Sequence, residues 1–69
     1  MSEIQSVLFS KRYWTVDRAK KWLREHKKLY GKMHTTKDHY RFRQTDPKKY
    51  KSFATKKVTP SIMFIYGIS

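Results

Sequence analysis

The alternation of hydrophobic and polar side chains is most regular over residues 39–45. At the period of two that a strand imposes, Tyr40 and Phe42 face one way. Arg41 and Arg43 face the other way, about 7 Å apart. An Asp-Pro pair follows and ends the strand, because proline has no N–H to donate to a neighbouring strand. We predict a strand with an aromatic face for the core and a cationic face for a polyanion.

Residues 16–30 instead repeat their apolar positions at steps of three and four, as the buried stripe of a helix does. Thr15 is a suitable N-cap, and Asp17 lies in the first turn, where the helix dipole favours a negative charge. Gly31 is the expected end of the helix. The stripe consists of Val16, Ala19, Trp22, Leu23, His26, Leu29 and Tyr30. The cations fall mostly off this stripe, so we expect the helix to form because the stripe is buried.

Two short apolar runs predict buried strands at residues 7–9 and 62–66, and Gly67 closes the second. Residues 32–38 lack periodicity and predict a connecting loop. Residues 1–5 predict a loose terminus.

Residues 47–53 begin with proline and predict a turn or a helix of one to two turns, with Tyr50 and Phe53 directed inward. Residues 54–59 are polar and basic. The order is thus strand, helix, strand, short helix or turn, strand. We predict a single α+β domain over residues 1–69. It has a small antiparallel or mixed sheet of about three strands, with the main helix packed on one face.

Charge is the strongest compositional feature, since 17 Lys and Arg face 5 Asp and Glu and give a formal net charge of +12. Self-repulsion of this size opposes the compact state, and the core of a 69-residue chain is marginal. An aromatic content of 16% is nonetheless too high for a disordered basic tail. We therefore expect a folded basic domain that meets an anionic partner.

Phosphate binding requires cations along a track, with arginine forks for bidentate contact. The alternative is a set of lysines that only solubilise the fold, but solubility needs a net charge of only about 2–8. Lysine outnumbers arginine, which favours contact with the backbone over reading of bases. The predicted nucleic-acid-binding residues are Lys20, Lys21, Arg24, Lys27, Lys28, Arg41, Arg43, Lys48, Lys49, Lys51, Lys56 and Lys57.

Aromatic side chains are candidates for stacking on single-stranded bases, at about 1–3 kcal/mol for each base. The candidates are Tyr13, Trp14, Trp22, Tyr30, Tyr40 and Tyr50. Packing in the core is the stronger alternative for Trp22, Phe42, Phe53 and Phe64, which lie on predicted inward faces.

The chain offers little for catalysis or for a cofactor. It has no cysteine, no glycine-rich phosphate loop and no closely spaced pair of carboxylates. Ser10, His26 and Asp38 can be written as a triad, but any chain of this size offers such a trio by chance. The spacing of His26, His34 and His39 matches no zinc motif. We predict a protein that is not an enzyme and has neither cofactor nor metal.

Membrane association is a weaker alternative. No apolar run approaches the roughly 18 residues that a membrane span needs. The opening Met-Ser-Glu-Ile-Gln is unlike a secretory signal, so we expect the protein not to be secreted. A basic amphipathic helix at residues 16–30 could lie on an anionic membrane surface, but the strands compete for its apolar stripe.

Along residues 7–67 the chain resembles a short uncharacterised domain of tailed-phage and large DNA-virus proteins. The positions that carry the resemblance are Trp14, Thr15, Ala19, Trp22, Leu23, His26, residues 40–44, Asp46, Pro47, Lys51, residues 55–57 and residues 62–67. Lys27 stands where a glycine usually follows the histidine, and Pro60-Ser61 stands where a glycine usually opens the last strand. The resemblance implies a viral origin and a virion or genome-handling setting, with no known reaction.

Two classes of function follow. The favoured one is a small nucleic-acid-binding protein of a DNA virus, more for DNA than for RNA, that contacts phosphates with little sequence preference. The second is a minor capsid or cement protein whose cations meet other virion proteins. An adaptor or inhibitor that docks an acidic host protein is not separated from the second by the sequence. We expect a location in the virion or in the host nucleus or cytoplasm, and edge strands that allow a homodimer.

Overall fold

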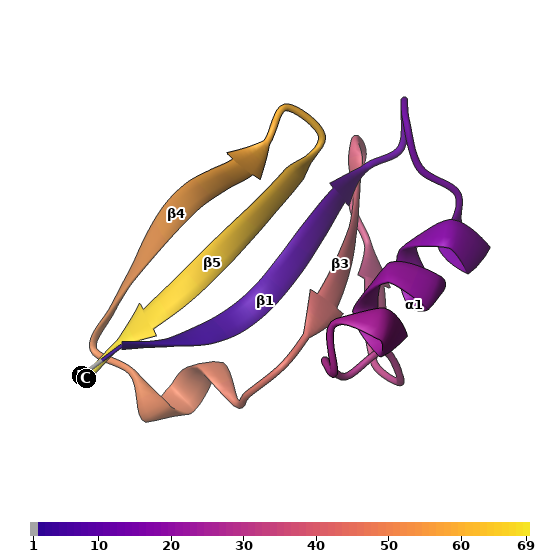
Figure 1. Ribbon diagram of the computed structural model, residues 1–69. Coiled ribbons are helices and arrows are strands. Elements are labelled where there is room, and N and C mark those ends of the chain that lie inside the picture. The colour runs from indigo at the N-terminus through magenta and orange to yellow at the C-terminus, as the bar shows by residue number, and fades with distance from the viewer. Residues whose placement is uncertain (1) are drawn as a thin grey trace.

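The computed structural model describes residues 2–69, which form one α-helix and a five-stranded antiparallel sheet (Figure 1). The strands are β1 (Ser2–Ser10), β2 (Met33–Thr35), β3 (His39–Arg43), β4 (Ser52–Thr59) and β5 (Ile62–Ile68). They lie in the order β2-β3-β1-β5-β4. The helix α1 (Val16–Glu25) follows β1, and the 3-10 turn η1 (Pro47–Lys49) joins β3 to β4. The α+β class is confirmed, whereas the prediction of about three strands is wrong.

The two edge strands account for this error. β2 lies within the predicted loop, and β4 occupies residues predicted as a short helix and a polar segment. All eight residues of β4 are exposed, so neither side of the strand imposes an alternation on the sequence. β4 forms because its backbone pairs with β5. Phe53 lies in β4 with 49% of its surface exposed, so its predicted inward direction is also wrong.

The core lies between α1 and the β3-β1-β5 part of the sheet. Its buried side chains are Val7, Phe9, Ala19, Leu23, Phe42 and Ile62. Phe9 is central, because its ring makes edge-to-face contacts with Trp14, Trp22 and Phe42 at centroid distances of 5.0, 5.6 and 5.7 Å. The alternation predicted for the strand that begins at residue 39 is confirmed in β3, since Phe42 is buried and Arg43 is exposed. Here the side of the sheet under α1 is termed the covered face, and the other side the open face.

The end of α1 differs from the prediction. The helix begins after the predicted Thr15 cap but ends well before Gly31. Lys27 adopts a left-handed conformation with φ 56°. The Lys28 N–H then donates to the Leu23 carbonyl at 2.8 Å, as in a Schellman motif. No helix in residues 2–69 has the length and apolar character that crossing a membrane requires.

β1 contains an irregularity that affects the open face. Met1 lies outside the described residues, but residues 2–5 belong to β1, so the prediction of a loose terminus is wrong for them. The register with β5 shifts between Ile4 and Ser6, which leaves Gln5 as an extra, bulged residue. Gln5 is only 1% exposed, so its amide must be satisfied within the fold.

Candidate nucleic-acid interface

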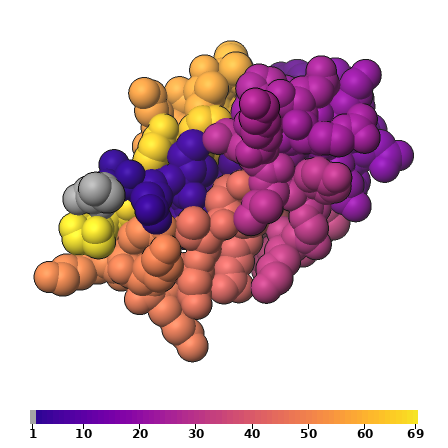
Figure 2. All heavy atoms as spheres, turned by 60° about the horizontal axis from the view of Figure 1, so that its bottom comes forward, coloured from indigo at the N-terminus to yellow at the C-terminus, as the bar shows by residue number. Residues whose placement is uncertain are grey.

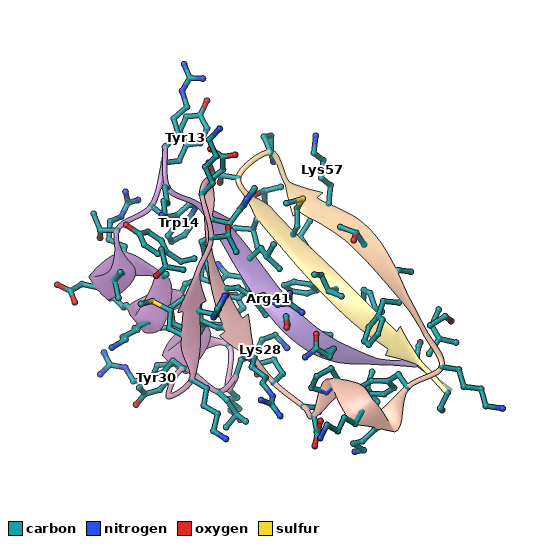
Figure 3. The ribbon with its side chains drawn as sticks, turned by 180° about the vertical axis from the view of Figure 1, so that it is seen from behind. Tyr13, Trp14, Lys28, Tyr30, Arg41 and Lys57 are labelled. Carbon is teal, nitrogen blue, oxygen red and sulfur yellow. The ribbon has the colours of Figure 1, made fainter. Side chains whose placement is uncertain are left out.

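The open face presents the side chains that alternate with the core. Figure 3 looks onto this face, with α1 behind the sheet and Arg41 and Lys57 labelled. The strand registers align one row of side chains across all five strands, formed by His34, Arg41, Leu8, Met63 and Lys57. The middle of this row is apolar, and basic side chains lie on both sides of the middle. The open face is therefore a half-buried apolar band flanked by basic groups.

Arg41 is fixed on this face by uncharged partners. Its Nε donates to Ser6 Oγ at 3.1 Å, and its Nη2 donates to Gln5 Oε1 at 3.0 Å. Gln5 is itself held, because its Nε2 donates to the Thr45 carbonyl at 3.0 Å. No ion pair to Arg41 occurs within residues 2–69. This half-buried guanidinium therefore has no carboxylate partner in that part of the chain and has N–H donors left for a ligand.

A surface cavity of about 250 Å³ lies beside Arg41. The Arg41 site, as we term it, is lined by Gln5, Ser6, His34, Arg41, Arg43 and Pro47. Arg43 also pairs with Asp46 at 3.5 Å, but both side chains are about half exposed and such pairs are weak. Two guanidinium groups and an imidazole thus surround one cavity. The repulsion between the two guanidinium groups would be relieved by an anion with several acceptor oxygens, such as a phosphate.

The helix cations lie on the other side of the molecule. Ala19 and Leu23 face the sheet and are buried, so the basic residues of α1 face solvent. Lys28 Nζ lies 5.6 Å from the centre of the Phe64 ring, on the covered face. Lys56 is opposite Phe64 in the β4–β5 register and shares that face. These helix-side cations are Lys20, Lys21, Arg24, Lys27, Lys28 and Lys56.

The remaining predicted cations follow β3. Lys48 and Lys49 lie in η1, and Lys51 precedes β4. Lys57 lies opposite Met63 on the open face. In Figure 2 the segment around η1, in orange, and α1, in magenta, lie at opposite ends of the visible surface. The predicted cations therefore lie on two sides of the sheet, and Arg43 lies at the end of the sheet where these sides approach each other beside Leu29 and Lys32.

Tyr50 closes the η1 end of the open face. Its ring covers Gly67, where an added Cβ would overlap the ring. Its hydroxyl donates to the Glu3 carboxylate at 2.6 Å and lies 2.7 Å from the Thr45 hydroxyl. The hydrogen bond from Tyr50, and then the charge of Lys49 at 3.8 Å, lower the pKa of Glu3. This carboxylate is engaged at η1 and is not paired with Arg41.

The predicted stacking aromatics divide between core and surface. Trp14 and Trp22 pack on Phe9, and the Trp14 indole N–H donates to Ser61 Oγ at 2.9 Å. Tyr13 and Tyr30 remain 56% and 43% exposed. The core alternative is thus confirmed for Trp22 and Phe42, which contact the central phenylalanine.

His26 lies apart from His34 and His39, which lie on neighbouring strands. His26 stacks on Trp22 with ring centres 3.8 Å apart, whereas His34 and His39 lie on β2 and β3. Among residues 2–69 no cluster of three His, Asp or Glu side chains could hold a metal ion. The structure therefore offers no new support for a zinc site.

Sequence reasoning missed Gln5 and Ser6, the two residues that position Arg41. The alternation of Ser6, Leu8 and Ser10 with Val7 and Phe9 could have extended the first strand and placed Ser6 on the open face. No comparable pattern identifies Gln5, because it occupies the bulge, where the period of two is interrupted.

Comparison of the chain with protein-family models, curated proteins and solved structures finds no match.

Proposed function

We propose that the chain is a small non-enzymatic nucleic-acid-binding protein that contacts the phosphate backbone. The observation that carries this proposal is Arg41, a half-buried guanidinium positioned by Ser6 and Gln5. A charged group that loses hydration on burial is normally paired with an opposite charge. The partners of Arg41 are instead neutral. A phosphate in the Arg41 site would complete the pairing and use the arginine fork.

The proposal extends to the kind of binding. The remaining cations are mostly exposed lysines, which suit contact with phosphates without selection of bases. We propose DNA in preference to RNA and a virion or genome-associated setting, both of which depend on the resemblance described above. The repulsion within a chain of charge +12 would also be relieved by such a partner.

The most specific test keeps the positive charge at position 41 and removes the bidentate guanidinium group. Arg41→Lys replaces the planar fork by a single ammonium, which keeps at most one N–H for a phosphate when it also contacts Ser6 and Gln5, so binding to a labelled duplex should fall about tenfold in 100 mM salt. Arg12→Lys, at an exposed turn, is the matched control and should bind as the wild type does. The affinity of the wild type should fall with log salt at a slope near −0.9 for each phosphate contact.

Two outcomes would contradict the proposal. If the wild type does not bind duplex or single strand at low salt, nucleic-acid binding is wrong. If Arg41→Lys binds as tightly as Arg12→Lys, the protein binds through its overall charge and the Arg41 site has no special part.

A second function is favoured by a different observation. Three large apolar side chains near the β4–β5 edge remain exposed, namely Phe53 at 49%, Val58 at 43% and Ile68 at 37%. Exposed apolar groups beside basic ones are typical of a protein interface. A virion structural protein would show salt-resistant association with purified capsid subunits, and Phe53→Ser would weaken it.

A further inference from the structure

We propose that one molecule bridges two DNA duplexes, one on the helix-side cations and one on the open face. This inference rests on the proposed function and adds an activity to it. It starts from the separation of the predicted cations into two groups. A single binding track would hold one duplex, whereas two opposed basic surfaces can each hold one.

The two groups are separated by the whole thickness of the fold. α1 packs on the sheet through Ala19 and Leu23, and its cations face away from the sheet. Arg41 lies on the opposite side, beyond the core, and Arg43 lies nearer the end of the sheet, where it also lines a hollow with Leu29 and Lys32. Figure 1 shows α1 on one side of the sheet, and Figure 3, seen from behind, labels Arg41 on the other. The molecule measures 31 × 20 × 19 Å.

Each surface also keeps an excess of positive charge of its own. On the helix side, six cations accompany Asp17 and Glu25. On the open face, the only acidic groups with ion pairs in residues 2–69 are Asp46 and Glu3, which contact Arg43 and Lys49. Neither surface therefore needs the other to attract phosphates.

Screening makes the two surfaces independent. The Debye length is about 8 Å at physiological ionic strength, well below the shortest dimension of 19 Å. Phosphates bound on one side would thus hardly neutralise the other side. One duplex also cannot reach both sides, because DNA has a persistence length of about 150 base pairs and bends strongly only at high cost. The second surface is then free for a second duplex.

The test uses two duplexes of the same sequence, one attached to beads and one fluorescent. The full-length protein should carry the fluorescent duplex onto the beads, while it sediments as a monomer when free. Three double variants each remove two positive charges. They are Arg41→Gln with Arg43→Gln, Lys21→Gln with Arg24→Gln, and the control Arg12→Gln with Lys37→Gln.

The helix-side variant should still bind one duplex at the Arg41 site. The open-face variant should still bind one duplex at the helix-side cations, but more weakly than the wild type, because the arginine fork is lost. Removal of two phosphate contacts should lower the magnitude of the salt slope by about 1.8. Capture of the second duplex should fall at least tenfold for both, and little for the control variant. Loss of capture with binding retained is the signature of two surfaces on one molecule.

The outcomes that overturn this inference differ from those that overturn the proposed function. Wild-type binding of a duplex without capture would refute bridging and leave nucleic-acid binding intact. Capture that persists in both surface variants, with a dimer mass in sedimentation, would assign bridging to paired molecules and also refute it. Absence of binding to either duplex would refute both proposals.

Discussion

The covered face and the open face of the sheet differ in how they use their side chains. The covered face places Phe9 among three aromatic rings and holds every fully buried apolar side chain of residues 2–69. The open face leaves Leu8, Met63 and Ile65 half-buried and fixes Arg41 through uncharged groups. The side chains that stabilise the fold most therefore lie on one side of this sheet. The other side can therefore carry unpaired charge.

The largest effect should come from the covered face. Phe9→Ala should lower the free energy of unfolding by about 3–5 kcal/mol, because it empties the centre of the aromatic cluster. Leu8→Ala is the matched control on the open face, where the side chain is only half-buried, and should cost about 1–2 kcal/mol. Urea unfolding would measure both. Equal losses would contradict the division of roles between the faces.

Gly67 tests whether the open face tolerates added volume. Gly67→Ala should destabilise the fold by about 1–3 kcal/mol, because the new Cβ would overlap the Tyr50 ring. In a Tyr50→Ala background the same substitution should be nearly neutral, so a double-mutant cycle in urea isolates this contact. Additive losses would show that the ring does not restrict Gly67.

Lys27 has two roles on the helix side, because it follows the last turn of α1 in a left-handed conformation and also carries a positive charge. Lys27→Gly should stabilise the fold by about 1 kcal/mol, because the left-handed conformation is strained for lysine and free for glycine. For a domain of this size the Tm should rise by about 4–8 °C in a circular dichroism melt. Lys20→Gly, within α1, should instead lower stability by about 1 kcal/mol. A fall in Tm for Lys27→Gly would contradict the Schellman assignment.

The smallest effect concerns Glu3 at the end of the open face. Its folded pKa is lowered by Tyr50 and Lys49, so the ionised carboxylate contributes stability above the pKa of a free glutamate, about 4.3. This contribution is lost as the pH falls through the lower folded pKa. Glu3→Gln should therefore melt slightly below the wild type at pH 7, and the difference in Tm should vanish toward pH 3. A constant difference would assign the effect to packing.

The sequence predicted the covered face better than the rest of the fold. Burial of Phe42 and its neighbours produces a period of two in the sequence. The Thr15 cap depends on one residue type at the start of the helix. Both features can therefore be predicted from the sequence alone. β4 leaves no such mark, because its side chains are exposed on both sides. The end of α1 was missed because Lys27 takes the conformation that glycine normally supplies.

The sequence predicts the cations of the candidate site but not the groups that position them. Arg41 and Arg43 were assigned correctly to the outward side of their strand. The partners that fix Arg41 come from β1, more than thirty residues earlier in the chain. Contacts at that separation depend on strand order and on the bulge at Gln5, which composition and periodicity do not encode.

The placement of the two tryptophans has a consequence for spectroscopy. Trp14 and Trp22 both contact Phe9 on the covered face, and the chain has no other indole. Intrinsic fluorescence therefore reports on undocking of α1 and on quenchers that approach from that side. An anion bound beside Arg41 would hardly change the fluorescence of either tryptophan. Emission that stays constant while a labelled oligonucleotide gains anisotropy would localise the contact to the opposite surface without a single mutation.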